Sequence, residues 1–360
     1  MKAVINAQVL AKELKKISPI IKKNSVLPIL SCVKLSFEKG KLVISATDLE
    51  TLVLVTVDCE CTNPFVIVIE YSSLLDACSK IFEPISIDAS GKEISIISGT
   101  TKFKFAKTNN EETFPKIDTE EFLFDINVEV DFFTALLAAN SCRSDDNFKP
   151  ALSYPCIHVK KDILTLVGTD AHVLYKTDMK IKTGKEIQAL VNDPFVQMVK
   201  GFGSAKVSFG EKFIKAEYAN MVVMSRLIDS KYCFYENIIP KDLEFNFKIE
   251  RASLIKSLGV AGVASDPSTH FCVISFNGGD IKIESKDIVF GKESETKVKA
   301  IHTVEIPSIG VNGNQMLKLL NLFDSEEVEM AFRGENSTIL LRPFGEPNTV
   351  CLLQPLMINA

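Results

Sequence analysis

The sequence lacks the motifs on which most catalytic and metal sites are built. Its nine cysteines form no CxxC pair, and its four histidines stand singly, without the spacing of zinc ligands. It contains no GxSxG elbow, no P-loop, no GxGxxG fingerprint and no HExxH motif. We therefore expect no catalytic residue, no metal and no cofactor, and we expect that the protein is not an enzyme.

Long apolar runs are missing as well. No stretch reaches the roughly 18 to 20 residues that a membrane-spanning helix needs. The first residues, MKAVINAQ, soon become polar and lack the apolar core of a signal peptide. Most cysteines stand inside apolar stretches, which is typical of reduced thiols packed in a core. These features predict a cytoplasmic protein without a membrane partner.

The composition is that of a globular protein. Of its 360 residues, 46% are hydrophobic and 24% are charged, which allows two or three domains with sizeable cores. The formal net charge of -5 argues against a protein that holds phosphates tightly through clustered lysine and arginine.

A short motif indicates an internal repeat. A small residue followed by Thr-Asp ends an apolar strand at Thr47-Asp48 and again at Thr169-Asp170. A Thr-Asp pair after a strand is ordinary turn chemistry by itself. A third strand of the same pattern ends at Asp287. We expect the three aspartates to cap the ends of equivalent strands.

Two amphipathic helices recur at the same intervals. The apolar spacing predicts helices at Ala7–Ser18, Phe132–Cys142 and Ala252–Val263, and a second set at Ser72–Phe82, Asp193–Phe202 and Gly313–Phe323. Alternating strands outnumber the helices and arrive in hairpin-like runs, so an α+β fold of antiparallel sheets with helices on one face is predicted. Proline-containing polar joins place three similar domains at residues 1–120, 121–243 and 244–360.

Six short motifs in the same order carry a resemblance to a known family. They are Leu27-Pro28-Ile29-Leu30, Thr47-Asp48-Leu49-Glu50, Phe114-Pro115, Thr169-Asp170-Ala171-His172, Asp229-Ser230-Lys231-Tyr232 and Gln354-Pro355-Leu356. With them the chain resembles the bacterial DNA polymerase III beta subunits, the sliding clamps. The resemblance implies three tandem repeats of the DNA clamp (processivity factor) fold and a head-to-tail homodimeric ring, with sheets outside and helices lining the hole. Such a ring encircles duplex DNA independently of sequence and tethers the replicative polymerase.

Enclosure of DNA reconciles this resemblance with the acidic net charge, because a ring needs only a mildly positive inner surface. The residues expected near DNA are Lys12, Lys15, Lys16, Lys22, Lys23, Asn24, Lys149 and Lys200. Further basic residues on the other helical segments are Arg143, Arg251, Lys256 and Lys318. The alternative is that these charges are ordinary solvated helix faces.

The resemblance also implies a groove that takes a short, largely apolar peptide from each partner. By position its residues are Leu152, Thr169, Ala171, His172, Val173, Leu174, Cys233, Asn237, Ile238, Thr338, Leu352, Gln354, Pro355, Leu356 and Met357. The implied partners are the alpha subunit of the replicative polymerase and the ATP-dependent clamp loader, with repair polymerases, mismatch-repair proteins and ligase as further candidates. Ala171, Val173, Cys233 and Met357 depart from common family residues, so we expect a more apolar, slightly narrower groove with its own peptide preference.

The dimer contact implied by the resemblance joins the first domain of one subunit to the third domain of the other. Phe103, on an alternating strand, is the candidate from the first domain, and Val260 and Val263 are its candidate counterparts.

Two other classes stay open. A scaffold of three units that never encircles DNA shares the repeat and the lack of motifs. An enzyme with an unrecognised site is expected to hold perturbed carboxylates or histidine in a deep cleft.

Overall fold

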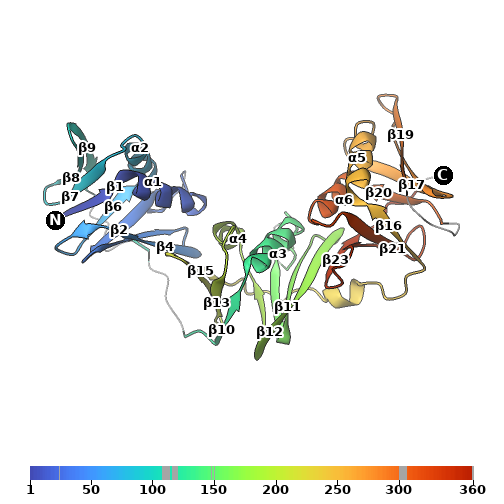
Figure 1. Cartoon of the computed structure of the whole chain (residues 1–360), viewed down its shortest axis with the longest axis horizontal. Coiled ribbons are helices and arrows are strands. Elements are labelled where there is room, and N and C mark those ends of the chain that lie inside the picture. Colours follow the sequence, from blue (N-terminus) through green and yellow to red (C-terminus); the bar gives the residue numbers. More distant parts are fainter. Residues whose placement is uncertain are drawn as a thin grey trace. The chain divides into compact units, whose positions relative to one another are not determined.

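The computed structural model describes residues 1–23, 25–107, 114–115, 121–146, 148–149, 151–299 and 306–358. The contacts between residues divide the chain into two compact units. Figure 1 shows the whole chain, coloured by residue number. Unit 1 consists of Met1–Leu137 and Val191–Asp229, and unit 2 consists of Ala138–Leu190 and Ser230–Ala360.

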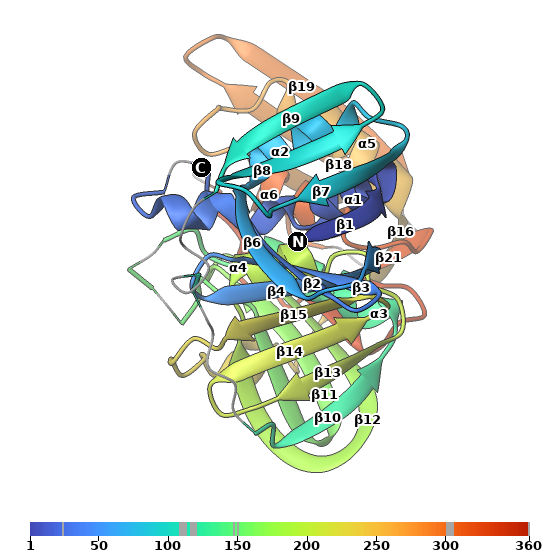
Figure 2. The same ribbon diagram turned by 90° about the vertical axis from the view of Figure 1, so that its left-hand side faces the viewer.

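Unit 1 contains two antiparallel sheets. The five-stranded sheet has the order β5 (Glu60–Cys61), β1 (Lys2–Asn6), β7 (Pro84–Asp88), β8 (Glu93–Ser98) and β9 (Thr101–Ala106). The eight-stranded sheet has the order β10 (Phe124–Val128), β13 (Ala205–Phe209), β14 (Phe213–Tyr218), β15 (Met221–Arg226), β4 (Thr51–Asp58), β3 (Lys41–Thr47), β2 (Cys32–Glu38) and β6 (Phe65–Glu70). Figure 2 shows β4 beside β15, so this sheet is continuous between strands from distant parts of the sequence.

The helices of unit 1 pack their apolar faces inward. They are α1 (Ala7–Lys16), α2 (Tyr71–Ser79), α4 (Asp193–Met198) and the short η1 (Ser18–Ile20) and η2 (Pro28–Ser31), while α3 (Val130–Ser141) begins in unit 1 and ends in unit 2. The Asn6 side chain caps α1 by accepting from two backbone N–H groups. Leu10 and Leu14 of α1 are fully buried. The Tyr71 hydroxyl of α2 donates to the Leu14 carbonyl at 3.1 Å, which ties the two helices together.

Unit 2 repeats this arrangement. Its six-stranded sheet has the order β11 (Cys156–Thr169), β12 (Val173–Leu190), β23 (Thr349–Leu353), β22 (Ile339–Pro343), β21 (Glu327–Phe332) and β16 (Phe245–Glu250). Its four-stranded sheet has the order β19 (Lys292–Lys299), β18 (Asp280–Asp287), β17 (Phe271–Asn277) and β20 (Ile309–Asn312). The helices are α5 (Arg251–Gly262), α6 (Gly313–Leu320) and η3 (Tyr235–Ile238). Arg251 of α5 donates through Nε to the Ser325 carbonyl just after α6, at 2.7 Å.

The small residue before the second Thr-Asp pair is required by packing. A Cβ atom at Gly168 would lie 1.8 Å from the carbonyl oxygen of Ala139 in α3, so only glycine lets this helix approach β11 so closely. The first copy carries Ala46 at this position, and its methyl group is buried.

The sequence-based predictions of the elements are confirmed. All six expected helices are present, and every strand pairing described above is antiparallel, as the α+β prediction requires. Helix α4 ends at Met198, earlier than expected, because the chain turns at Gly201 with a φ of 81°. None of the helices described is long and apolar enough to cross a membrane. The domain boundaries near 121 and 243 stay a prediction.

Candidate functional site

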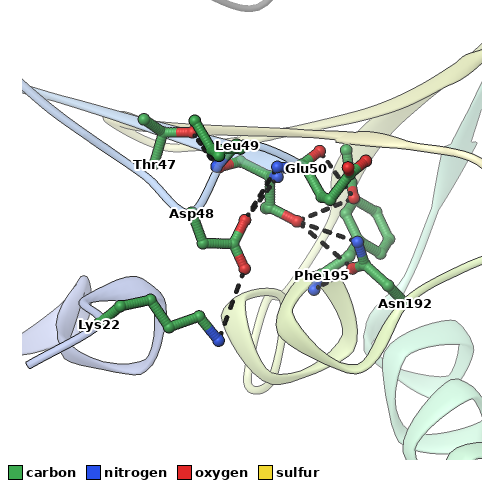
Figure 3. A network of polar contacts seen from close by, with 9 residues as sticks. Lys22, Thr47, Asp48, Leu49, Glu50, Asn192 and Phe195 are labelled. Carbon is green, nitrogen blue, oxygen red and sulfur yellow. Dashed lines mark hydrogen bonds and ion pairs between the residues drawn. The ribbon is translucent and has the colours of Figure 1, made fainter. Parts of the chain in front are cut away.

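The first Thr-Asp pair forms a compact turn between β3 and β4 (Figure 3). The Thr47 hydroxyl donates to the Thr51 carbonyl at 2.8 Å and accepts from the Leu49 N–H at 3.0 Å. The Asp48 carboxylate accepts from the N–H groups of Glu50 and Thr51 at 3.2 and 2.8 Å. Leu49 has a φ of 83°, which the side-chain hydrogen bonds around it stabilise.

The second pair forms the same turn between β11 and β12. The Thr169 hydroxyl donates to the Val173 carbonyl at 2.6 Å and accepts from the Ala171 N–H at 3.1 Å. The Asp170 carboxylate accepts from the N–H groups of His172 and Val173 at 2.8 and 2.7 Å. Ala171 has a φ of 80°. The strand-capping role expected for Asp48 and Asp170 is therefore confirmed.

The third turn differs. Among the described residues, Asp287 accepts from the Phe290 N–H alone, at 3.1 Å, and this turn between β18 and β19 is two residues longer than the other two. The carboxyl is buried, and its Oδ2 atom has no hydrogen-bond partner among the described residues.

The strand after each of the first two turns pairs with a strand from much later in the sequence. We call the pairing of β4 with β15 the first junction and that of β12 with β23 the second junction. The Glu50 carbonyl accepts from the Arg226 N–H at 2.9 Å, and the His172 carbonyl accepts from the Gln354 N–H at 2.8 Å. The two junctions therefore share one backbone geometry.

Polar side chains surround the first junction (Figure 3). Arg226 pairs with Glu50 at 3.3 Å, and Lys22 lies 3.8 Å from the Asp48 carboxylate. Beneath the turn, the buried Thr51 hydroxyl lies 2.9 Å from the Ser225 hydroxyl and 3.3 Å from the Asn192 side chain. Two ion pairs therefore flank this turn, while Leu49 and Glu50 stay exposed.

The second junction is apolar and open. Val173 and Leu353 replace the buried hydroxyl pair, while Ala171 and His172 are exposed at the turn. The Thr338 hydroxyl donates to the Gln354 side chain at 3.3 Å. From the predicted groove set, the structure brings together these residues: Thr169, Ala171, His172, Val173, Leu174, Thr338, Leu352 and Gln354.

The predicted groove set continues along the end of the chain. The Leu356 N–H donates to the Gly310 carbonyl at 2.8 Å, which holds the residues after β23. Pro355 and Leu356 are half-buried, and Met357 is 75% exposed. This short segment presents apolar surface next to the second turn.

The remaining predicted groove residues lie on two other segments of unit 2. The Leu152 carbonyl accepts from the Ser144 N–H at 2.8 Å, in the loop after α3. Cys233, Asn237 and Ile238 lie in or next to η3. Burial raises the pKa of the Cys233 thiol, which therefore stays neutral and behaves as a small apolar side chain.

Side chains of β11 and β12 form hydrogen bonds with the segment around η3. Tyr232 and Tyr235 are buried, and the Tyr235 hydroxyl lies 2.9 Å from Nδ1 of His158. The Tyr232 N–H donates to the Gln188 side chain at 3.1 Å. Burial, aided by the nearby Lys160, lowers the pKa of His158. Tyr232 belongs to the Asp229-Ser230-Lys231-Tyr232 motif, whereas His158 and Tyr235 stand outside any motif and could not be recognised as anchors from the sequence.

The predicted DNA-proximal lysines are all exposed where the structure describes them. Lys12, Lys15, Lys16, Lys22, Lys23, Lys149 and Lys200 are in this group, and Asn24 lies outside the described residues. Lys16 is engaged by the buried Glu13 at 2.7 Å, and Lys149 lies 3.9 Å from Asp146. The carboxylates reduce the local positive charge at these two positions.

Of the predicted dimer residues, Phe103 lies on an edge strand, and Val260 and Val263 lie at the end of α5. Phe103 is half-buried on β9, an edge strand, and stacks with Phe105 at a centroid distance of 6.5 Å. Val260 is 46% exposed and borders a hollow of about 360 Å³ between α5 and the edge strand β19. Val263, just after α5, is 77% exposed.

Chemically, the open second junction can bind an extended peptide. It offers aliphatic and thioether side chains for apolar contact, with hydroxyl and amide groups for orientation. Within the part of the chain that the structure describes, no cluster of three or more His, Cys, Asp or Glu side chains could hold a metal ion.

Two family models match parts of this chain, and similar proteins and solved structures match nearly all of it. A family model described as the DNA polymerase III beta subunit, N-terminal domain, matches residues 1–118, and one for the C-terminal domain matches residues 236–357. The chain is 22% identical over 369 residues to the beta sliding clamp of Pseudomonas putida, which covers 99% of this chain and 100% of that protein. It is 19% identical over 368 residues to the beta sliding clamp of Escherichia coli, with the same coverage.

Solved structures share its fold. The DnaN sliding clamp of Pseudomonas aeruginosa bound to griselimycin has a TM-score of 0.94 at 20% identity, covering 99% of this chain and 100% of that one. The DNA polymerase III beta subunit of Thermotoga maritima has a TM-score of 0.89 at 20% identity, with the same coverage.

Proposed function

Because the chain belongs to the DNA polymerase III beta subunit family, we propose that it is a DNA sliding clamp. As such it encircles duplex DNA as a head-to-tail dimer and tethers the replicative polymerase. This proposal rests on the backbone geometry that the first and second junctions share. It also rests on β9 and β19, two edge strands that can form a third junction.

The third junction forms between two copies of the chain. Strand β19 follows the third turn as β4 and β12 follow the first two, and β9 occupies in its sheet the place of β15 and β23. Edge strands with unpaired backbone groups add further strands readily. In the register of the internal junctions, where Thr51 faces Ser225 and Val173 faces Leu353, Lys292 faces Phe105 of a second copy.

Side-chain chemistry fits this register. Glu293 and Glu295 of β19 then face Lys104 and Lys102 of β9 in the second copy, so opposite charges are paired across the junction. Ser294 faces Phe103. Because the Ser294 hydroxyl lies 3.3 Å from the Ala261 carbonyl in α5, Phe103 is directed to the α5 side, where Val260 lies.

A charge-reversal cycle tests the dimer. The K102E/K104E variant should be monomeric in sedimentation equilibrium at concentrations where the parent protein is a dimer. The E293K/E295K variant should fail in the same way, and K102E/K104E/E293K/E295K should dimerise again, because its opposed charges are exchanged rather than lost. A quadruple variant that stays monomeric would contradict this register.

A ring of two copies encloses duplex DNA without a tight grip. The lysines of α1 and of the segment after η1 give the inner helices positive charge, while the whole chain stays acidic. The test is topological. The protein is loaded on nicked circular DNA with its cognate loader and ATP, isolated in high salt, and the circle is then cut once. Release on cutting is expected, whereas retention on the linear DNA would favour the open scaffold.

Charge reversal at Lys22 and Lys23 tests the inner surface further. K22E/K23E should shorten the retention on closed circles, because two exposed positive charges of the proposed inner surface become negative. Since Lys22 also pairs with Asp48, the single K23E variant isolates the effect on DNA. Unchanged retention in both variants would remove these lysines from the DNA-facing set.

The second junction is the proposed docking groove for partner peptides, with the fifteen residues from Leu152 to Met357 named above as its walls. The partners are the polymerase alpha subunit and the clamp loader, with repair polymerases, mismatch-repair proteins and ligase as additional users. Docking, and not catalysis, is then the work of the protein in the cytoplasm. Titration calorimetry with the clamp-binding peptide of the organism's own polymerase tests the groove.

A further inference from the structure

Among the described residues of unit 2, the turn between β18 and β19 contains the longest run of consecutive exposed large apolar residues. Ile288, Val289 and Phe290 follow one another with 82%, 82% and 68% of their surfaces exposed. The hairpin stands clear of the rest of unit 2 in both views (Figures 1 and 2). Three consecutive exposed apolar residues are costly in water unless they serve a function.

This turn departs from the other two in a way that indicates a missing partner. The first two turns place two residues between the capping aspartate and the next strand, whereas the third places four, Ile288–Gly291. The Asp287 side chain is 1% exposed, and its Oδ2 atom has no hydrogen-bond partner among the described residues. A buried carboxylate oxygen without a donor is rare in a completed structure.

The base of the hairpin is fixed, so the tip is held in place. Two residues below the turn, the hydroxyls of Ser285 and Ser294 lie 2.9 Å apart, and both donate to the Ala261 carbonyl of α5. Val260 and Val263, at this end of α5, are exposed as well. The tip and the end of α5 therefore present apolar surface on both sides of Ser294.

We propose that the tip, Ile288–Phe290, is a clasp that docks on a second copy of this chain just beyond the end of β9. This inference rests on the proposed ring dimer and adds a contact to it. In the first two junctions the last residue of the turn accepts from the N–H that follows the paired strand segment, as Glu50 does from Arg226 and His172 does from Gln354. In the same register Gly291 accepts from Ala106 of the second copy.

Because this turn has two more residues than the other two turns, its apolar side chains extend past Ala106 and contact the second copy. No other occupant follows from this geometry, because the turn that leads into β19 must lie against whatever pairs with β19. The clasp has no counterpart at the internal junctions, where both strands belong to one chain. A contact between separate chains gains most from such an anchor, since no covalent connection holds the strands together.

The test compares dimer dissociation among three proteins. The I288N/V289G/F290S variant keeps the length of the turn and removes its apolar surface, and a deletion of Val289 and Phe290 gives the turn the length of the other two. Both should dissociate at least roughly tenfold more readily than the parent in sedimentation equilibrium, because the buried apolar anchor is lost. Circular dichroism should show unchanged folding.

The matched control is F148S, which removes a side chain that is 95% exposed and lies on a different loop of unit 2. It should leave the dissociation constant unchanged. If both tip variants dimerise like the parent, the clasp is wrong while the ring stands. If the parent itself is monomeric at all concentrations, the proposed dimer fails. Normal dimerisation with loss of clamp-loader binding would assign the tip to another partner and overturn the inference.

Discussion

The first and second junctions use the same turn and the same backbone hydrogen bonds but differ in the side chains around them. At the first junction, Glu50 and Arg226 form an ion pair over the turn, and Thr51 and Ser225 are bonded beneath it. At the second junction the corresponding residues are His172 and Gln354 above, and Val173 and Leu353 beneath.

This difference is the reason why the proposed docking groove is assigned to the second junction and not to the first. A peptide that covers the first turn must desolvate the half-exposed charges of Glu50 and Arg226, a cost that the uncharged side chains of His172 and Gln354 do not impose. At the second turn no such pair stands in the way, and exposed apolar groups gain by being covered. The backbone thus sets the position of a site, and a few side chains decide whether it is used.

The largest predicted effect concerns the packing under the second turn. G168A places a methyl group against the Ala139 carbonyl and should lower the free energy of unfolding by about 3 kcal/mol, measured by urea denaturation. The matched change under the first turn, A46G, removes one buried methyl group and should cost about 1 kcal/mol. Equal losses would mean that the close approach of α3 is not specific to the second turn.

The next prediction compares the loss of a capping asparagine that also contacts the first junction with the loss of a capping asparagine that does not. Asn192 caps α4 by accepting from the Phe195 N–H at 2.9 Å and also contacts Thr51, so N192A should lose about 2 kcal/mol of stability. Asn6 caps α1 by accepting from the Gln8 and Val9 N–H groups at 3.0 and 3.1 Å and is exposed, so N6A should lose about 1 kcal/mol. A larger loss in N6A would show that the buried contact with Thr51 contributes nothing.

Exchange of side chains should close the second junction. H172E/Q354R recreates the Glu50–Arg226 pair over the second turn and should weaken binding of the polymerase peptide roughly tenfold in titration calorimetry, because the new ion pair must be broken. The reverse change at the first junction, E50A/R226A, should leave this affinity unchanged. If H172E/Q354R binds as tightly as the parent, the ion pair does not explain why the first junction is unused.

The smallest effect is a pH dependence of stability that comes from His158, which lies on β11 and contacts Tyr235 of η3. Since the pKa of His158 is lowered in the folded protein, the unfolded chain takes up the proton first as the pH falls below about 6.5. The stability that neutral His158 contributes is therefore present above that pH and is lost as the pH falls through its folded-state pKa. Denaturation of the parent and H158Q between pH 7 and 5 should converge as the pH falls, and parallel curves would rule out His158 as the titrating group.

Two acidic groups with lowered pKa values titrate below the pH range that tests His158. The pKa values of Asp88 and Asp266 are lowered to about 2, by hydrogen bonds from Ser90 and Ser268 respectively, so the stability linked to them is lost only at lower pH.

Periodic features could be predicted from the sequence because local spacing carries them. The apolar spacing of α1 and α5 and the alternation of β9 were sufficient to place these elements. The Thr-Asp turn was also predictable, since its hydrogen bonds join residues no more than four apart. Part of the groove set followed from the resemblance, and the structure joins Thr169–Leu174 to Leu352 and Gln354 through strand pairing.

Contacts between distant residues could not be predicted in this way. The Asn192–Thr51 contact and the His158–Tyr235 hydrogen bond join residues 141 and 77 positions apart, and neither residue pair has a local signature. The same holds for the register of β12 on β23, which decides that Val173 faces Leu353 and leaves His172 exposed.

The sequence by itself determined the helices, the strands and the three turns, because backbone preference and apolar periodicity act over a few residues. Only the tertiary structure decided which turn is flanked by ion pairs, which is open, and which keeps a buried carboxylate oxygen without a hydrogen-bond partner among the described residues. The physical reason is that burial and pairing depend on residues that the folded chain brings together from distant positions in the sequence.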